Sequence, residues 1–225
     1  MSEEKKTGRQ QAGMERKGGL VHDALVLFVI TLIAALALGF VNEITKEPIA
    51  QAQAQAKVDA CKAVFPSMSE TAEWDNETGE GLKAAQAVVD ANSVYTGTTV
   101  DEILLAKGST GETLGWIMTL TSSKGYGGKI TMTMGVSGDG RLQGIEFLEI
   151  SETPGLGMKA KDEEFKSQFQ DVRVGQYSLA KRNIPGDTEI QAISSATITT
   201  AAVTRMLDAG LKVFNEMYKG GVTIE

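Results

Sequence analysis

Hydrophobic residues form one long uninterrupted block near the start of the chain. Residues 24–41 read ALVLFVITLIAALALGFV and include no charged side chain. At about 1.5 Å per residue, a helix of this length spans roughly 27 Å, close to the thickness of a bilayer's hydrocarbon core. A cleaved signal peptide would have a shorter apolar run and a small-residue cleavage site, and residues 42–48 offer no A-x-A pattern. A buried core helix is disfavoured because the block is apolar on every side. The pattern predicts a transmembrane helix at residues 24–42.

Helical patterns are expected in three further segments. Residues 43–66 are rich in Ala, Gln and Lys and predict a helical stalk that ends near Pro66. A short helix is expected around residues 82–89. The clearest pattern begins at Thr199, where apolar residues recur three and four positions apart. They are Val203, Met206, Leu207, Leu211, Phe214 and Met217. This apolar face predicts a C-terminal helix that packs on a sheet.

A period of two marks strands at residues 115–121, 129–136 and 142–150. In the second strand one face carries Ile130, Met132, Met134 and Val136. Residues 137–140 read Ser-Gly-Asp-Gly, which is typical of a turn and predicts a hairpin. Because these strands follow one another without intervening helices, the sequence predicts an α+β fold with an antiparallel sheet and flanking helices.

Composition and charge exclude several classes of protein. The chain has 225 residues and a net charge of −7, which disfavours a protein that neutralises nucleic-acid phosphates. One cysteine, Cys61, and one histidine, His22, rule out a disulfide within the chain, a C-x-x-C zinc site and an iron–sulfur cluster held by this chain alone. Cys61 is expected to be a packed small residue, and no metal site is predicted.

The distribution of basic residues predicts the orientation in the membrane. Residues 1–23 hold five basic side chains, whereas residues 42–61 hold two. By the positive-inside rule, the tail 1–23 is expected in the cytoplasm and residues 67–225 form an extracytoplasmic domain.

Hydroxyl residues gather at the start of the C-terminal helix, where residues 194–200 read SSATITT. They could simply cap the helix, because Ser and Thr oxygens accept hydrogen bonds from its first N–H groups. Alternatively, a helix start with small residues binds an anion such as phosphate.

Two loops add to this picture. Residues 151–157 read SETPGLG and follow the last predicted strand, so they form either a surface loop or a close approach to a flat ligand. Residues 124–129 read KGYGGK and lack the spacing of a P-loop. They form a flexible hairpin turn, or Tyr126 packs near an aromatic cofactor.

Together these elements resemble the covalent-FMN domain found in the G subunit of the Rnf ion-translocating electron-transport complex. The same domain occurs in the C subunit of the sodium-pumping NADH:quinone reductase. The resemblance rests on E-T-P-G-L-G at residues 152–157 and S-x-A-T at residues 194–197, in the order anchor, stalk, G-Y-G-G, loop and terminal helix.

The resemblance implies FMN bound through a phosphoester on Thr197, installed by a separate flavin transferase. The residues matching the cofactor-binding motifs are Ser194, Ser195, Ala196, Ile198, Thr199, Glu152, Thr153, Pro154, Gly155, Leu156, Gly157 and Tyr126. The family usually has glycine where Ser195 stands, and often an acid where Gln191 stands. Serine fits the first position unless the backbone there needs a positive φ.

The resemblance also implies a function: an electron-relay component of a membrane-bound ferredoxin:NAD oxidoreductase that pumps ions, with other subunits of that complex as partners. The single span carries no charge, so the chain is not expected to be the ion channel itself. Three alternatives remain: the C subunit of the quinone reductase, a colourless extracytoplasmic scaffold, and a stand-alone flavin reductase. The last would need acid–base groups, and no convincing set is found.

Overall fold

The computed structural model describes residues 19–74, 79–173, 177–179 and 189–218. The chain divides into two compact units, Met1–Gln51 and Ala52–Glu225. The predicted cytoplasmic tail lies almost wholly outside the described residues. A continuous helix, α1 (Leu20–Val64), contains residues 24–42 of the predicted span and all but the last two residues of the segment 43–66 predicted as a stalk. It ends two residues before Pro66, as expected where a proline ring disfavours helical backbone in the residue before it.

The apolar part of α1 is exposed along its length. Its most apolar window has a mean hydropathy of 2.9, and none of that window is buried within the protein. By length and composition, α1 is the one helix among the described residues that could cross a membrane. An apolar surface of this extent requires a lipid or protein environment.

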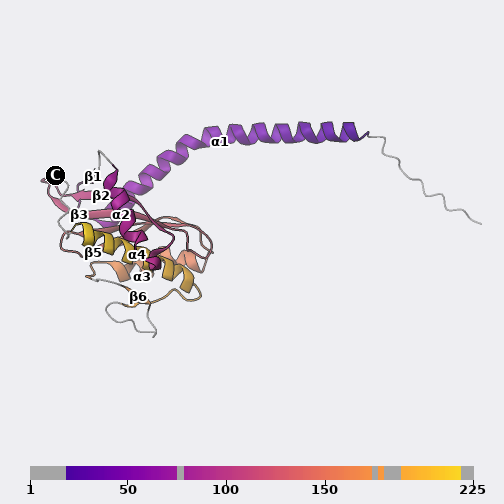
Figure 1. Cartoon of the computed structure of the whole chain (residues 1–225). Helices are drawn as coiled ribbons and strands as arrows, with labels where there is room; N and C mark the ends of the chain where they lie inside the picture. Colours follow the sequence, from indigo (N-terminus) through magenta and orange to yellow (C-terminus); the bar gives the residue numbers. More distant parts are fainter. Residues whose placement is uncertain (1–18, 75–78, 174–176, 180–188, 219–225) are drawn as a thin grey trace, which may run out of the picture. The chain divides into compact units, whose positions relative to one another are not determined.

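Five antiparallel strands form a sheet with the order β1-β2-β3-β4-β5 (Figure 1). The strands are β1 (Glu70–Glu73), β2 (Thr98–Lys107), β3 (Thr113–Ser122), β4 (Ile130–Ser137) and β5 (Leu142–Ile150). The predicted α+β class, the three predicted strands and their hairpin are confirmed. The pattern missed β1 and β2. In β2 a register shift between Val100 and Glu102 breaks the alternation on which strand prediction depends.

The remaining elements are short, apart from the last helix. They are α2 (Glu80–Asp90), η1 (Ser93–Tyr95), η2 (Gly157–Lys161), α3 (Glu163–Lys166), η3 (Ser167–Phe169), β6 (Ser178–Leu179), β7 (Glu189–Ile190) and α4 (Thr197–Met217). The strands β6 and β7 form a small parallel pair. The predicted helices near residues 82–89 and at the C-terminus correspond to α2 and α4.

The two faces of the sheet are covered by different helices. On one face α4 packs against β3 and β4, and Phe214 meets Trp116 edge-to-face at 5.8 Å between ring centroids. On the other face the end of α1 contributes Val64, which with Phe65 packs against Ile117 of β3. The central strands are therefore covered on both faces, and the start of α4 meets the β3–β4 turn and the loop after β5 at one end of the sheet.

Candidate functional site

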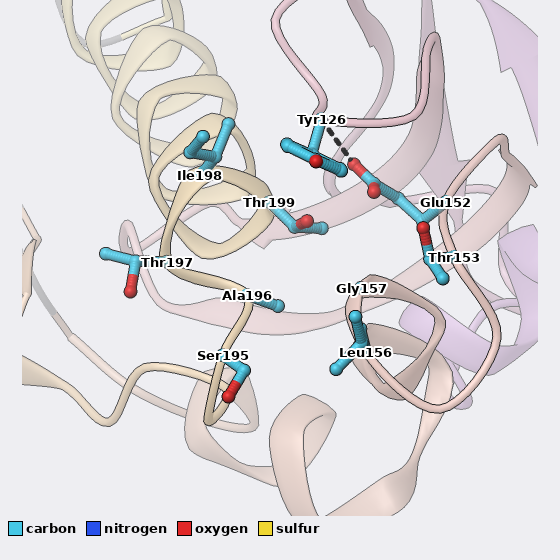
Figure 2. Close-up of a pocket in the computed structure, with 10 residues that line it drawn as sticks. All are labelled: Tyr126, Glu152, Thr153, Leu156, Gly157, Ser195, Ala196, Thr197, Ile198 and Thr199. Atoms are coloured by element: carbon cyan, nitrogen blue, oxygen red, sulfur yellow. Dashed lines mark hydrogen bonds between the residues drawn. The ribbon is translucent and has the colours of Figure 1, made fainter.

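A cavity of about 400 Å³ opens where three segments separated in sequence meet. The β3–β4 turn, the loop after β5 and the first turn of α4 supply its lining (Figure 2). The lining residues are Tyr126, Glu152, Thr153, Leu156, Gly157, Ser195, Ala196, Thr197, Ile198 and Thr199. These are ten of the residues that the sequence proposed for the cofactor. Its volume lies within the usual range for small-molecule sites, about 300–1,000 Å³.

Three of the proposed residues do not line this cavity. Pro154 and Gly155 lie at the tip of a turn spanning residues 153–156, which is closed by a 3.1 Å bond from the Leu156 N–H to the Thr153 carbonyl. Gly155 has a φ of 77°, so the Pro-Gly pair has the residue types of a type II turn. The third residue, Ser194, lines a neighbouring cavity of about 210 Å³.

Glu152 joins two of the three segments. Its buried carboxylate accepts hydrogen bonds from the backbone N–H of Tyr126 at 2.7 Å and of Gly127 at 3.1 Å (Figure 2 marks the first). The sequence placed Glu152 near a ligand but did not predict this bond across 26 positions. The carboxylate therefore holds the β3–β4 turn, and with it the exposed ring of Tyr126, against the cavity.

Gly157 lets these segments approach the helix. A Cβ atom there would lie 2.7 Å from both Glu152 Oε2 and Thr199 Oγ1. Both distances are shorter than real Cβ contacts allow, so only glycine fits at this meeting point.

The hydroxyl groups before α4 do not cap it. Ala196 occupies the N-cap without a side-chain capping bond, and the first backbone bond runs from the Thr200 N–H to the Ala196 carbonyl at 3.0 Å. The N–H groups of the first turn therefore have no partner within the helix, and they carry the positive end of the helix dipole. Such a helix start favours an anion.

Thr197 is the first residue of α4, and its side chain is exposed. In Figure 2 it lies on the far side of the helix start from Glu152 and Thr153, at the rim of the cavity. Its hydroxyl is thus open to an incoming reagent.

Apolar side chains surround the mouth of the cavity. Tyr126, Leu156 and Ile198 are 71%, 39% and 53% exposed, and they are three of the five large apolar residues exposed in the described part of residues 52–225. The arrangement suits a ligand with a flat apolar part and an anionic end. Among the described residues, no group of three or more His, Cys, Asp and Glu side chains could hold a metal ion.

Two further side chains, those of Gln168 and Thr200, hold the segment that leads into α4. Thr200 belongs to the hydroxyl cluster found in the sequence, but no contact was predicted for it, and Gln168 was not singled out. The Gln168 side chain accepts a bond from the Gln191 N–H at 2.8 Å and donates one to the Gln191 carbonyl at 3.4 Å. Thr200, fully buried, bonds to the backbone of Ile193 and Ala196. Each is an ordinary polar residue in sequence, and only its contacts reveal its role.

Comparison with known proteins gives consistent matches. The model of the family described as FMN-binding domain matches residues 125–212, which include all of the cavity-lining residues. The chain is 30% identical over 200 residues to the G subunit of the Na(+)-translocating ferredoxin:NAD(+) oxidoreductase complex of Acetobacterium woodii, covering 87% of this chain and 91% of that protein. It is 29% identical over 190 residues to the G subunit of the ion-translocating oxidoreductase complex of Methanosarcina acetivorans, covering 83% and 90%. Among solved structures, NqrC of Shewanella oneidensis superposes with a TM-score of 0.46 at 21% identity, covering 52% of this chain and 59% of that one.

Proposed function

This chain belongs to the family of G subunits of ion-translocating ferredoxin:NAD(+) oxidoreductase complexes, and from that premise we propose its function. It is an electron-relay flavoprotein subunit of such a complex, and it carries FMN covalently on Thr197. The observation that carries this proposal is the cavity itself, which joins the uncapped start of α4 to the loop after β5 within the region matched by the FMN-binding family.

The described residues fit FMN. The first-turn N–H groups of α4 suit its phosphate, and the exposed apolar side chains of Tyr126, Leu156 and Ile198 suit its flat ring. When bound, FMN supplies one- and two-electron redox chemistry, and the protein supplies binding and position. Gly157 keeps the loop and helix close together, and Glu152 holds the turn that bears Tyr126.

Covalent attachment is proposed at Thr197 because its hydroxyl is exposed at the helix start. In the attachment step the Thr197 O–H bond breaks and an O–P bond forms to the FMN phosphorus of a flavin dinucleotide. The anhydride P–O bond breaks, the nucleoside monophosphate leaves, and a base of the flavin transferase takes the proton. The ester removes the dissociation route, which suits a domain outside the cytoplasm.

The membrane arrangement is part of the same proposal. Residues 24–42 span the membrane, residues 43–66 form a stalk, and residues 67–225 form the extracytoplasmic FMN domain. The basic tail 1–23 lies in the cytoplasm, as the positive-inside rule predicts. The span has no charged residue, so other subunits of the complex conduct the pumped ion.

The experiment that tests this proposal is mass spectrometry of the tryptic peptide covering residues 183–205, from protein co-produced with a flavin transferase. We expect the peptide mass to increase by FMN less one water, with fragmentation placing the addition on Thr197. The peptide contains six other hydroxyl residues, so locating the addition on Thr197 distinguishes this site from six alternatives. An unmodified peptide would leave the chain as a membrane-anchored scaffold without flavin.

A further inference from the structure

The segment before Thr197 is a strained turn. The Ala196 N–H bonds to the Ile193 carbonyl at 2.9 Å, which closes a turn over residues 193–196. Ser195, in its third position, has a φ of 62°. A side chain with a Cβ is disfavoured in this left-handed region, and type II turns place glycine there. Contacts with residues outside the turn must therefore stabilise it, because serine disfavours this backbone conformation.

The Thr200 hydroxyl contacts both ends of this turn. Its oxygen accepts a hydrogen bond from the Ile193 N–H at 3.1 Å and donates one to the Ala196 carbonyl at 3.0 Å. Thr200 is fully buried, and Ile193 is 8% exposed. The hydroxyl therefore connects the first and last residues of the turn in a dry environment, where such bonds are strong and their loss is costly.

Thr204, one turn further along α4, offers a comparison. It is also buried, but its hydroxyl donates only to the Thr200 carbonyl, four residues earlier, at 2.9 Å. That bond is the ordinary contact of a helical threonine with its own helix and reaches no other segment. The contact to Ile193 is therefore particular to Thr200 and not a general property of buried threonines on this helix.

We propose that Thr200 is a positioning residue for flavin attachment. Its hydroxyl clamps the strained turn, and thereby fixes the direction of Thr197 and of the first-turn N–H groups. The inference rests on the proposed function, in which Thr197 carries FMN. Ala196 is bonded to Thr200 and directly precedes Thr197, so the clamp acts one residue from the modified oxygen.

Replacing the hydroxyl by a methyl group separates the clamp from side-chain packing. In Thr200→Val the Ala196 carbonyl keeps its bond from the Thr200 N–H, but the Ile193 N–H loses its partner. An unpaired buried N–H favours other conformations of the turn by enough to lower the competent population about tenfold.

The experiment measures the rate of covalent flavin incorporation into the full-length chain in detergent, with purified flavin transferase and flavin adenine dinucleotide. Incorporation is read as fluorescence of the denatured band, and thermal unfolding of each variant is recorded beside it. We expect Thr200→Val to incorporate flavin about tenfold more slowly. Thr200→Ser, which keeps the hydroxyl, should restore the rate, and Thr204→Val should react like the wild type.

A double variant tests the coupling to strain and covers the case in which Thr200→Val folds poorly. Glycine at residue 195 adopts the left-handed backbone without strain, so the turn depends less on the Thr200 hydroxyl. The double variant Ser195→Gly/Thr200→Val should therefore incorporate flavin faster than Thr200→Val alone. Equal rates for wild type and Thr200→Val, or equal losses in Thr200→Val and Thr204→Val, would overturn the inference. A wild type that takes up no flavin would instead reject the proposed function on which the clamp depends.

Discussion

Ser195 occupies a backbone conformation that suits glycine. Its φ of 62° resembles the 77° of Gly155, and each residue stands third in a four-residue turn beside the cavity. In the loop after β5 the sequence supplies Pro-Gly, which matches the turn without strain. Before α4 it supplies Ser-Ser, and contacts from Thr200 hold the turn instead. The departure from the family pattern at residue 195 is therefore a real conformational conflict.

Relief of this strain should stabilise the protein. We expect Ser195→Gly to raise the free energy of unfolding by about 0.5–1 kcal/mol, because the gain in the left-handed region exceeds glycine's greater entropy in the unfolded chain. Ser194→Gly is the matched control, since residue 194 has no positive φ and should lose about 0.5 kcal/mol. Denaturant titration of both variants measures the difference. A stability for Ser195→Gly at or below that of Ser194→Gly would contradict the strain.

The end of α1 lies close to the sheet where it crosses β4 and β5. Gly135 of β4 and Gly144 of β5 are cross-strand partners, and both lie under Val64. A Cβ at Gly135 would lie 2.6 Å from the Val64 carbonyl oxygen, whereas one at Gly144 would lie 3.7 Å from the Val64 Cα. The first contact is with backbone that cannot rotate away, and the second is an ordinary van der Waals contact.

This difference predicts unequal effects of the same substitution. Gly135→Ala should destabilise the fold by about 1–3 kcal/mol through overpacking. Gly144→Ala should change stability by less than about 1 kcal/mol, because it adds one methyl group at normal contact distance. Thermal unfolding of both variants provides the comparison. Equal losses would show that the end of α1 does not pack on β4 in this way.

A buried carboxyl on α4 gives the fold a pH dependence. Asp208 accepts a hydrogen bond from the Tyr177 N–H at 2.7 Å, and burial raises the pKa of its carboxyl to about 6 despite that bond. The folded state therefore holds the proton more tightly than the unfolded chain. Its stabilising contribution is complete below the unfolded pKa, near 4, and is lost as the pH rises through about 6.

Asp208→Asn isolates this effect, because asparagine keeps an acceptor oxygen for Tyr177 but does not titrate. The stability of the variant relative to wild type should increase by roughly 2.5 kcal/mol between about pH 4 and about pH 8. Denaturant titrations of both proteins across that range measure the difference. A difference that stays constant with pH would mean that Asp208 does not titrate within it.

Helices and strands were predicted from the sequence where a pattern among neighbouring residues determines them. The apolar residues of α4 recur with a period of 3.6 and those of β4 alternate with polar residues, so both elements were predicted. The bulge in β2 and the short acidic β1 carry no such pattern. At the site, the resemblance of sequence motifs to a known family named all ten lining residues. The bonds of Glu152 to Tyr126 and of Thr200 to Ile193 depend on how the chain folds back, and sequence alone did not predict them.

At the scale of the whole molecule, membrane attachment and redox chemistry are assigned to separate parts of the chain. The apolar, exposed part of α1 is the proposed anchor, and the cavity lies within residues 52–225. The chain offers no charged group within the span and no metal-binding cluster among its described residues. In the proposed function, the first part attaches the protein to the membrane and the second part binds the flavin.

Separation of the two parts predicts a soluble redox domain. A chain limited to residues 43–225, exported behind a cleavable signal peptide, should remain in the supernatant after ultracentrifugation. The full-length chain should sediment with membranes, because only it carries the apolar block. Sedimentation of the shortened chain with membranes from cells lacking the other subunits would contradict the anchor assignment.

The most direct test of the account is flavin fluorescence of the denatured protein band. The wild type, Thr197→Ala and the control Ser194→Ala are each produced with a flavin transferase and separated on a denaturing gel. The account predicts fluorescence from the wild type and Ser194→Ala, and none from Thr197→Ala, because only Thr197 carries the ester. A dark wild-type band, or equal fluorescence from Thr197→Ala, would contradict it.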